Sequence, residues 1–558
     1  MKAMHVLSAA EMQACDRATT ERFGVPSILL MRAASAAVAA FAREQFPHAR
    51  RVTVLCGRGS NGGDGMMAAQ LLADAGLNVT TLLLGAPEQL AGDAADAWRE
   101  LNDGTHGAIH VVLAAADLVQ YKEAFEADLI LDAVLGTGFK PPLKGLALSA
   151  LESLHRSQTP VLAVDLPSGW PADETAATLA QPVYPADAVI TFTAPKPAHV
   201  FGQLTRRWDQ PIVVAQIGSP DAAIVSALQL DWAGASLAVA RTPRAVAANK
   251  GNFGHVLVVG GTFGTAGGKA GAPTMTAMAA LRAGAGLVTA AVPAAALPVV
   301  SSFVPELMTW PLKANPAGQI TEENLAPKRL AALTEGKTVL AIGPGVGQSA
   351  ETAKFVAGLL SSTEMPAVID ADALNILAAK PALLAKLSRK GKRTVVLTPH
   401  PGEMARLTRT SISDVQANRL ETARKFARQM GVTVVLKGAR TVIAHPDGSA
   451  AVNTSGNPGL AKGGSGDLLT GLIAGLLAQI PDEPWRAIQA AVYLHGVSAD
   501  LAVSKGDEHT LLATDSLHEL AQAFRSHNHH FHSDGPNRYV WLQGGIACSG
   551  SSTRAAGI

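Results

Sequence analysis

Three segments in the first part of the chain place polar residues and glycines directly after a short apolar run. They read GRGSNGGDG at residues 57–65, LDAVLGTG at 131–138 and VDLPSG at 164–169. If the apolar runs are parallel strands, their carboxyl ends meet in one crevice, which is where α/β sheets bind ligands. A single glycine-rich loop is often a plain turn, and a single Asp there often caps a helix. Three such ends together favour a binding site.

A fourth segment, near the end of the chain, combines glycines with one acidic residue. Gly463–Gly466 precede Asp467, and the apolar residues that follow predict a buried helix over 467–480. Backbone N–H groups at such a helix start bind phosphate, and an Asp there can deprotonate a hydroxyl that attacks it. The alternative is an Asp that only caps the helix. Similar loops, GPGVG at 343–347, DADALN at 370–375 and TPHPGE at 398–403, favour a second crevice.

Alternating strands and helices must position these loops. The chain has 558 residues, 48% of them hydrophobic and only 4% aromatic, with 53 glycines. This composition suits two α/β domains with sheets covered on both faces. We expect domains at 1–220 and 241–525, a linker at 221–240 and a polar, His-rich tail without regular structure at 526–558. Strands are predicted at 51–56, 78–84, 127–134, 160–165, 188–193, 255–260, 338–342, 367–370, 394–397 and 433–436.

Charge and cysteine usage exclude several classes of protein. The formal net charge is +1, so neither nucleic acid nor an anionic membrane is expected as the main partner. The three cysteines, Cys15, Cys56 and Cys548, are far apart and predict neither a disulfide framework nor a zinc cluster. No segment predicts a secretory signal or a membrane span, so a cytoplasmic location is expected.

The motifs SNGGDG, LDAVLGTG and VDLPSG, in this order, resemble the NAD(P)H-hydrate epimerase family over about residues 5–215. The resemblance implies a Rossmann-like three-layer fold, with Asp165 as the catalytic group. It also implies a potassium ion held by Asn61, Asp132 and Ser168. The implied contacts to the hydrated nucleotide, besides Asp165, are Ser60, Asn61, Gly62, Gly63, Asp64, Gly136, Thr137, Gly138, Phe139, Lys140, Pro141 and Pro142.

Two positions depart from that family's pattern. Ser60 stands where the family usually has the first of two Asn residues, and its hydroxyl can still form hydrogen bonds. Arg32 stands where the family often has Glu, which reverses a charge. Whether Arg32 reaches the site is a question for the structure.

The later motifs GSGD, TPHPGE and DADALN, with the opening KGNFGHVLVVGG, resemble the ADP/ATP-dependent NAD(P)H-hydrate dehydratases of the ribokinase-like superfamily. The resemblance covers about residues 240–525 and implies a ribokinase-like α/β domain that uses Mg²⁺ and ADP or ATP. It implies that Asp467 is catalytic and contacts the hydrate together with Ala272, Gly347 and His400. The implied nucleotide contacts are Lys437, Gly438, Ala439, Arg440, Thr441 and Gly466.

Together the two resemblances imply an enzyme that repairs hydrated NADH and NADPH. The first domain would interconvert the R and S hydrates, and the second would dehydrate the S hydrate with ADP, the donor that an epimerase-first fusion implies. Relatives of this kind form homo-oligomers, so the same is expected here. One alternative is a ribokinase-like small-molecule kinase with an N-terminal nucleotide-binding module. Another is a non-catalytic binding protein.

Overall fold

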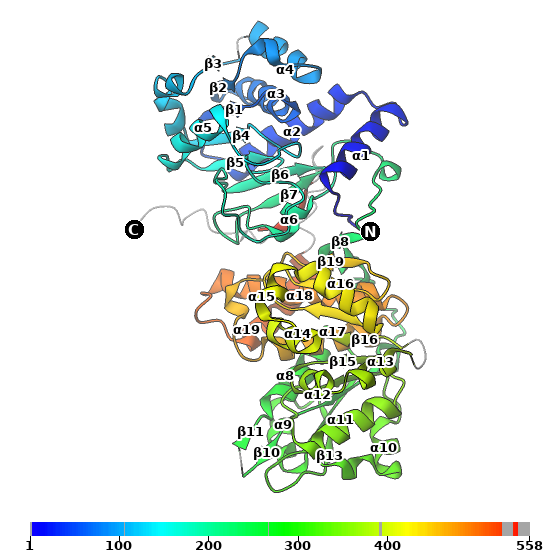
Figure 1. Cartoon of the computed structure of the whole chain (residues 1–558). Coiled ribbons are helices and arrows are strands. Elements are labelled where there is room, and N and C mark those ends of the chain that lie inside the picture. The colour runs from blue at the N-terminus through cyan, green and yellow to red at the C-terminus, as the bar shows by residue number, and fades with distance from the viewer. Residues whose placement is uncertain (1–2, 105, 266, 390–392, 527–538, 545–558) are drawn as a thin grey trace. The chain divides into compact units, whose positions relative to one another are not determined.

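The computed structural model describes residues 3–104, 106–265, 267–389, 393–526 and 539–544. The chain divides into two compact units (Figure 1). The first holds Met4–Leu230 together with the C-terminal strand β20, and the second holds Asp231–Ser526. The division therefore falls inside the segment expected as a linker. That segment nevertheless contains the strand β8 (Leu230–Trp232) and the short helix α7 (Leu237–Ala240).

The first unit contains an eight-stranded sheet in the order β20-β7-β6-β5-β4-β1-β2-β3. Neighbouring strands are parallel except β20, which runs antiparallel to β7. Five of these strands were predicted within one or two residues at either end, whereas β3, β7 and β20 were not. The strands are β1 (Arg51–Cys56), β2 (Asn78–Leu84), β3 (Ala108–Val112), β4 (Leu129–Ala133), β5 (Val161–Val164), β6 (Ala188–Phe192), β7 (Ile212–Ala215) and β20 (Tyr539–Gln543).

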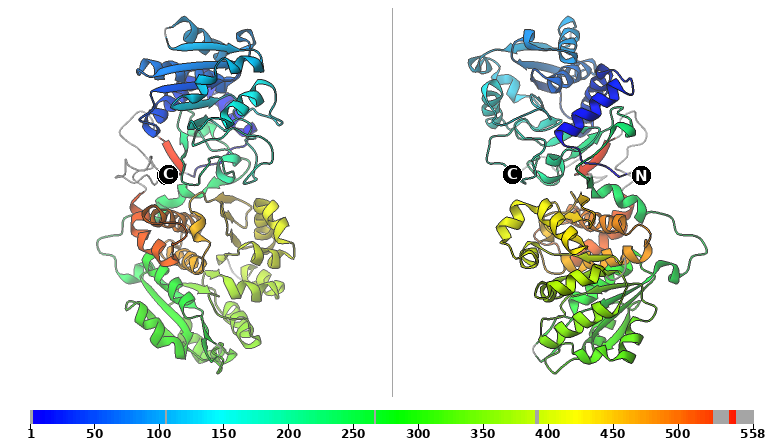
Figure 2. Two further views of the ribbon diagram at one scale, coloured as in Figure 1. Left: turned by 90° about the vertical axis from the view of Figure 1, so that its left-hand side faces the viewer. Right: turned by 45° about the vertical axis from the view of Figure 1, so that its right-hand side comes forward.

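Helices cover both faces of this sheet (Figure 2). Alternate side chains of a strand point to opposite faces, so β1 serves two cores. Val54 packs in one core with residues of α2 and α3, whereas Leu55 packs in the other with Leu151 of α5. This confirms the predicted three-layer α/β fold. The helices are α1 (Ala9–Glu21), α2 (Ser27–Gln45), α3 (Ser60–Asp74), α4 (Asp93–Asp103), α5 (Gly145–His155) and α6 (Pro197–Phe201).

The strand order reverses between β1 and β4, because β2 and β3 lie on one side of β1 and β4–β7 on the other. At such a switch point the loops that leave adjacent strands diverge and open a crevice. The loops after β1, β4 and β5 carry the three motifs of the first domain.

The strand β20 corrects part of the expectation for the tail. Residues 526–558 were expected to lack regular structure, yet Tyr539–Gln543 pair with β7. The rings of Tyr539 and Trp541 pack edge-on against Phe41, with centroids 5.4 and 5.9 Å away. The residues YVWLQ have high strand propensity, but the polar residues around them predicted a segment without regular structure. The His-rich segment lies outside the described residues.

The second unit contains a ten-stranded sheet in the order β13-β12-β9-β14-β15-β16-β17-β18-β19-β8. It is parallel from β13 to β17, and β17, β18 and β19 pair antiparallel. A separate hairpin joins β10 (Phe263–Gly264) and β11 (Gly267–Gly268). The other strands are β9 (His255–Val259), β12 (Leu287–Pro293), β13 (Met308–Leu312), β14 (Val339–Ile342), β15 (Ala367–Ile369), β16 (Val395–Leu397), β17 (Thr433–Leu436), β18 (Val442–Ala444) and β19 (Ala450–Val452).

The predicted buried helix is α17 (Ser465–Gln479), which packs closely on α8 (Gly271–Ala283). A Cβ at Gly471 would lie 2.1 Å from the Thr276 carbonyl oxygen, so only glycine permits this approach. The remaining helices are α9 (Leu297–Phe303), α10 (Pro327–Thr334), α11 (Ala350–Ser362), α12 (Ala371–Ala378), α13 (Pro381–Arg389), α14 (Pro401–Thr408), α15 (Ile412–Ala417), α16 (Arg419–Met430), α18 (Pro484–Lys505) and α19 (Ala513–Ser526).

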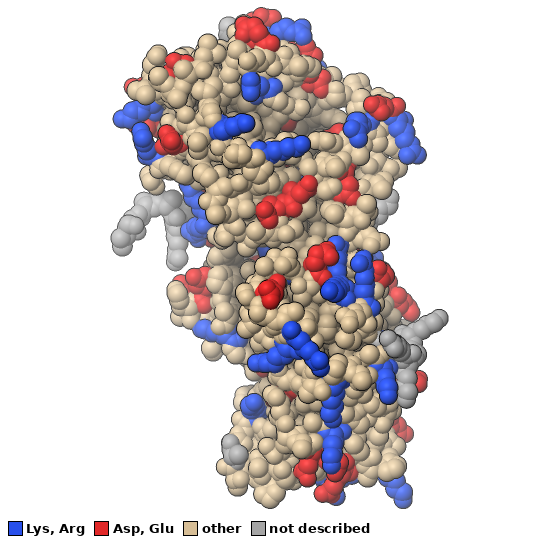
Figure 3. Space-filling view, in the orientation of Figure 1, with Lys and Arg blue, Asp and Glu red and all other residues tan. Residues whose placement is uncertain are grey.

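Lys and Arg side chains are interspersed with Asp and Glu on the face seen in Figure 3. Among the described residues, no helix combines the length and apolar character needed to cross a membrane.

Candidate active sites

The first unit contains a cavity of about 1360 Å³, lined by the loops after β1, β4 and β5 and by α1 and α2. Its volume suits a ligand of nucleotide size. Most of the predicted substrate contacts line it, but Gly62, Gly63 and Pro141 do not. Those that line the cavity are Ser60, Asn61, Asp64, Gly136, Thr137, Gly138, Phe139, Lys140, Pro142 and Asp165.

Two glycines of the first loop allow close backbone packing. A Cβ at Gly57 would lie 1.9 Å from the Val134 carbonyl oxygen, and one at Gly62 would lie 1.9 Å from that of Gly57. No side chain fits at either position. The loop after β1 is therefore pressed against the loop after β4, which brings Asn61 next to Gly136.

Asp165 is the most constrained residue of this cavity. It follows β5, is 7% exposed, and has a φ of 65°, in the left-handed region that residues other than glycine rarely adopt. Its Oδ2 accepts hydrogen bonds from the backbone N–H and the hydroxyl of Thr137, at 2.7 and 2.5 Å. Its Oδ1 accepts from Thr191 Oγ1 and from Lys196 Nζ, at 2.8 and 2.9 Å.

These contacts decide the charge of Asp165. Burial by itself raises the pKa of a carboxyl group, but the ammonium of Lys196 and the hydrogen bonds from Thr137 outweigh it. The pKa of Asp165 is therefore held well below its usual range. The opposite holds for Asp64 and Asp16 in the same cavity, where burial and neighbouring carboxylates raise the pKa.

Of the three residues predicted to hold a cation, Asn61 lines the cavity, whereas Asp132 and Ser168 do not. Asp132 and Ser168 are fully buried, and Ser168 Oγ donates to Asp132 Oδ1 at 2.6 Å. Leu135 donates its N–H to Ser168 Oγ and precedes Gly136, where an added Cβ would lie 3.2 Å from Asn61 Oδ1. Both polar side-chain atoms of Asn61 are buried without a hydrogen-bond partner. Burial raises the pKa of Asp132 to about 6, against hydrogen bonds from Ser168.

The two residues that depart from the epimerase pattern lie in different places. Ser60 is exposed at the start of α3 and lines the cavity. Arg32 does not line it and instead forms an exposed ion pair with Glu100 at 2.8 Å. The reversed charge at position 32 is therefore accommodated on the surface of the domain.

Sequence reasoning missed two buried residues next to Asp165, namely Lys196 and His199. Both come from the segment after β6, a fourth strand whose carboxyl end meets the same crevice. The signal was present in the sequence TAPKPAH at 193–199, which places a lysine between two prolines just after an apolar strand.

In the second unit, the glycine loop and Asp467 form the start of α17. Gly464 adopts a φ of 94° immediately before the helix, so the loop turns into it with free N–H groups at the helix start. Asp467 lies in the first turn. Burial and the negative charge of Asp370 raise its pKa to about 7, against the opposing effect of Lys437.

Lys437 forms ion pairs with two carboxyl groups near the start of α17. Its Nζ lies 2.9 Å from Asp370 Oδ1 and 3.9 Å from Glu403 Oε2. Thr470 of α17 donates to Asp370 Oδ2 at 2.9 Å, and a Cβ at Gly466 would lie 3.3 Å from Lys437 Nζ. The predicted residues Lys437, Gly466 and Asp467 are thus brought together. Asp370 and Glu403 lie at the centre of this cluster. The sequence placed them in the motifs DADALN and TPHPGE but did not single them out as site residues.

His400 caps α14 at the edge of this cluster. Its Nδ1 accepts from the Gly402 N–H at 3.0 Å, and its Nε2 lies 3.5 Å from Glu403 Oε1. Half of its side chain is exposed. Burial and the charges of Lys437 and Arg406 lower the pKa of His400, which favours a neutral ring.

The other predicted contacts of the second domain lie on adjoining loops. A Cβ at Gly345 would lie 3.4 Å from that of Ala272, and the Gly347 N–H donates to Asp372 Oδ2 at 3.0 Å. Gly438 and Ala439 are exposed, and Thr441 Oγ1 donates back to the Gly438 carbonyl. The half-buried side chain of Arg440 donates to the Thr454 carbonyl at 3.0 Å, which ties the loop to the segment after β19.

Comparison with known proteins assigns both halves of the chain. A family model described as "YjeF-related protein N-terminus" matches residues 27–198, and one described as "NAD(P)H-hydrate dehydratase" matches residues 256–522. A solved structure of the ADP/ATP-dependent NAD(P)H-hydrate dehydratase of Bacillus subtilis, co-crystallised with ATP and Mg²⁺, is 33% identical. It covers 52% of this chain and 96% of its own, with a TM-score of 0.44.

Curated relatives match nearly the whole chain. A bifunctional NAD(P)H-hydrate repair enzyme of Moorella thermoacetica is 38% identical over 538 residues, covering 94% of this chain and 97% of its own. One from Escherichia coli is 35% identical over 526 residues, covering 92% of each. The chain therefore belongs to the family of bifunctional NAD(P)H-hydrate repair enzymes.

Proposed function

We propose that the first domain interconverts the R and S hydrates of NADH and NADPH, and that the second dehydrates the S hydrate with ADP, giving AMP and phosphate. ATP is the alternative donor. Two carboxyl groups support this most directly: that of Asp165, which is buried, and that of Asp467, which is half-buried, each within a motif of its own domain.

Epimerisation requires the hydroxyl-bearing carbon beside the ring nitrogen to lose and regain its hydroxyl. The hydroxyl takes up a proton and leaves as water while the nitrogen lone pair forms a cationic C=N bond. Water then adds from the opposite face and releases a proton. The carboxylate of Asp165 stabilises the cation, and the Asp64 carboxylate takes up that proton after giving up its own. The buried carboxyl of Asp64 faces the same cavity and can supply the first proton.

The residues Asn61, Asp132 and Ser168 fit a potassium ion. The buried Asn61 Oδ1 has no hydrogen-bond partner, and a bound cation would satisfy it. Asp132 and Ser168 offer carboxylate and hydroxyl oxygens, which suit a hard cation. Bound potassium supplies positive charge behind the loops that hold the substrate. We expect Asp132→Ala to weaken epimerisation and excess potassium to restore it partly. Thermal unfolding of the wild type with increasing potassium checks the binding separately.

In the second domain, Asp467 accepts the proton of the S hydrate's hydroxyl as the oxygen attacks the terminal phosphate of the nucleotide. The phosphorylated oxygen then leaves as phosphate, driven by the ring-nitrogen lone pair, and loss of a proton from the adjacent ring carbon restores the reduced nicotinamide. Lys437 and the loop Gly463–Gly466 bind the phosphates, since cations and free N–H groups converge there.

Magnesium, when bound, neutralises the charge of the transferred phosphate. We therefore expect dehydration to need both a nucleotide and magnesium. Full activity with a chelator and without nucleotide would contradict the mechanism.

The deciding experiment incubates the protein with a mixture of hydrated NADH epimers, magnesium and either ADP or ATP. Recovery of the absorbance of reduced nicotinamide measures dehydration, and chromatography resolves the two epimers. Consumption of both epimers with stoichiometric AMP supports the proposal. Accumulation of a stable phosphorylated product without reduced nicotinamide would indicate a kinase instead.

We also propose that the protein works in the cytoplasm as a homo-oligomer. Cys15 and Cys56 are free thiols in buried positions, which suits a reducing compartment. Light scattering coupled to size-exclusion chromatography measures the oligomeric state, and fractionation of the source cells locates the protein.

A further inference from the structure

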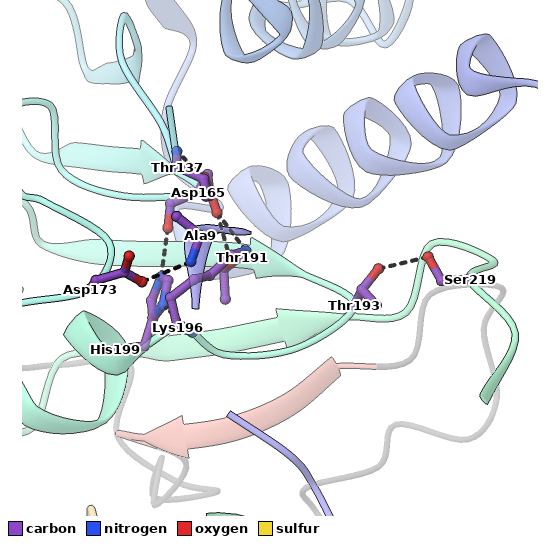
Figure 4. A network of polar contacts seen from close by, with 9 residues as sticks. All are labelled: Ala9, Thr137, Asp165, Asp173, Thr191, Thr193, Lys196, His199 and Ser219. Carbon is purple, nitrogen blue, oxygen red and sulfur yellow. Dashed lines mark hydrogen bonds and ion pairs between the residues drawn. The ribbon is translucent and has the colours of Figure 1, made fainter. Parts of the chain in front are cut away.

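Lys196 is the most buried charged side chain of the epimerase cavity, at 2% exposure. Its Nζ donates to Asp165 Oδ1 at 2.9 Å and to Thr191 Oγ1 at 2.7 Å, and Thr191 Oγ1 donates to the same Asp165 oxygen (Figure 4). Burying an ammonium group is costly unless it is paired. Since an apolar residue could fill this position at no such cost, the pair points to a role in the reaction.

The hydrogen bonds of Asp165 require an anion. Both carboxylate oxygens act only as acceptors, for one N–H, two hydroxyl groups and one ammonium. A proton on either oxygen would have to replace one of these donors. Lys196 contributes the only full positive charge among the four, so it is the contact on which the charge of Asp165 depends most.

A second contact fixes the backbone of Asp165. His199 Nδ1 accepts the Lys196 N–H at 3.0 Å, so the ring proton resides on Nε2, which donates to the Asp165 carbonyl oxygen at 2.7 Å. Burial and the charge of Lys196 lower the pKa of His199 to about 4, and the ring stays neutral. Asp165 holds a φ of 65°, and this bond, together with that from its own N–H to Ile190, maintains it.

We propose that Lys196, anchored through His199, is the positioning residue that keeps Asp165 ionised and directed into the epimerase cavity. The inference rests on the proposed epimerase function of Asp165. Without Lys196, the carboxyl group would be left buried beside the carboxyl groups of Asp64 and Asp16, with the neutral His199 behind it. Burial and the two neighbouring carboxyl groups favour its protonated form, against the hydrogen bonds that Thr137 and Thr191 still donate, and a protonated Asp165 does not stabilise the cation.

The central experiment compares Lys196→Met with the wild type in the full-length protein. Methionine retains much of the volume and removes the charge. We expect the epimerisation kcat to fall about a hundredfold or more, with a much smaller change in KM, and its acidic pH limb to move to higher pH. Dehydration of purified S hydrate should be unchanged. Lys122→Met, an exposed change of the same charge in the same domain, is the matched control.

Two further variants test the role of Lys196. In Lys196→Ala, added ethylammonium should restore part of the epimerisation rate, because Lys196 lines the cavity and an amine can enter the vacated space. A purely structural lysine would not respond to the amine. If Lys196→Met does not fold, Thr191→Val tests the same network, with an expected loss of about tenfold and the same direction of pH shift.

The outcomes separate this inference from the proposed function. Wild-type epimerisation and pH profile in Lys196→Met, with Asp165→Ala inactive, would overturn the role of Lys196 and leave the epimerase assignment intact. Full epimerisation by Asp165→Ala would instead overturn the assignment on which the inference rests. A lower rate in Lys196→Met with an unshifted pH limb and no amine rescue would also contradict the inference.

Discussion

Each of the two domains contains an aspartate at its proposed reaction centre and a lysine nearby, yet the two lysines make different contacts. In the first, Lys196 contacts Asp165 itself and holds its pKa low. In the second, Lys437 contacts Asp370, and the negative charge of Asp370 helps burial raise the pKa of Asp467 to about 7. The same residue types thus give one carboxylate that stays charged and one that exchanges protons near neutrality.

The chemistry of the two domains explains this difference. A permanently charged carboxylate suits the stabilisation of a cation, whereas a general base is most effective when its pKa lies near the working pH. The two roles differ because Lys196 pairs with Asp165 itself, whereas Lys437 pairs with Asp370, a neighbour of Asp467.

The strongest test of the comparison removes Asp165. Asp165→Ala should lower epimerisation by about 10²–10⁴-fold, leaving little more than the spontaneous rate. The S hydrate should still be dehydrated, because Asp467 belongs to the other domain. Time courses of both epimers after chromatographic separation measure the two rates, and consumption of both at the wild-type rate would reassign the first domain as a binding module.

The reciprocal change is Asp467→Asn, which keeps the shape of the side chain and removes the base. Dehydration should fall by about a hundredfold or more while epimerisation persists. The assay is recovery of reduced-nicotinamide absorbance with nucleotide and magnesium, followed in parallel with epimer exchange. Near-normal dehydration would rule out Asp467 as the base.

The third prediction tests whether β20 contributes to the free energy of unfolding of the first domain. Trp541 is 8% exposed and packs on Phe41, so Trp541→Ala should destabilise the first domain by about 3–5 kcal/mol. Calorimetry, with residual epimerase and dehydratase activities measured after heating, shows which transition moves. Val225→Ala, an exposed change in the same unit, is the control. Earlier loss of dehydratase activity instead would contradict the pairing of β20 with β7.

The smallest effect concerns the pH dependence of dehydration. Because the pKa of Asp467 is about 7 and its ionised form is the base, the rate should rise with pH through about 7 and fall in acid. Asp370→Asn removes a negative neighbour and frees Lys437, and both changes lower the pKa of Asp467. The acidic limb of the rate profile should therefore move to lower pH. A limb that stays in place would show that Asp370 does not control the charge of Asp467.

Local sequence was sufficient for most of the parallel strands and for the loops that form the candidate sites. The β1, β2, β4, β5 and β6 strands are continuous apolar runs, and the glycines beside them mark places where the backbone must pack closely or adopt a positive φ. For the same reason the motifs located Asp165, Asp467 and the residues around Asn61. These features depend on residues that are adjacent in the chain.

What depended on long-range contacts could be decided only by the tertiary structure. Residues Tyr539–Gln543 form β20 because the rings of Tyr539 and Trp541 pack on Phe41, about 500 residues away in the chain. Arg32 lies in a surface ion pair because the fold places Glu100 beside it. Above all, the charges of Asp165 and Asp467 depend on contacts that only the fold creates, because pKa values respond to distance and burial rather than to residue type. Lys196 pairs with Asp165 itself, whereas Lys437 pairs with Asp370, whose negative charge raises the pKa of Asp467.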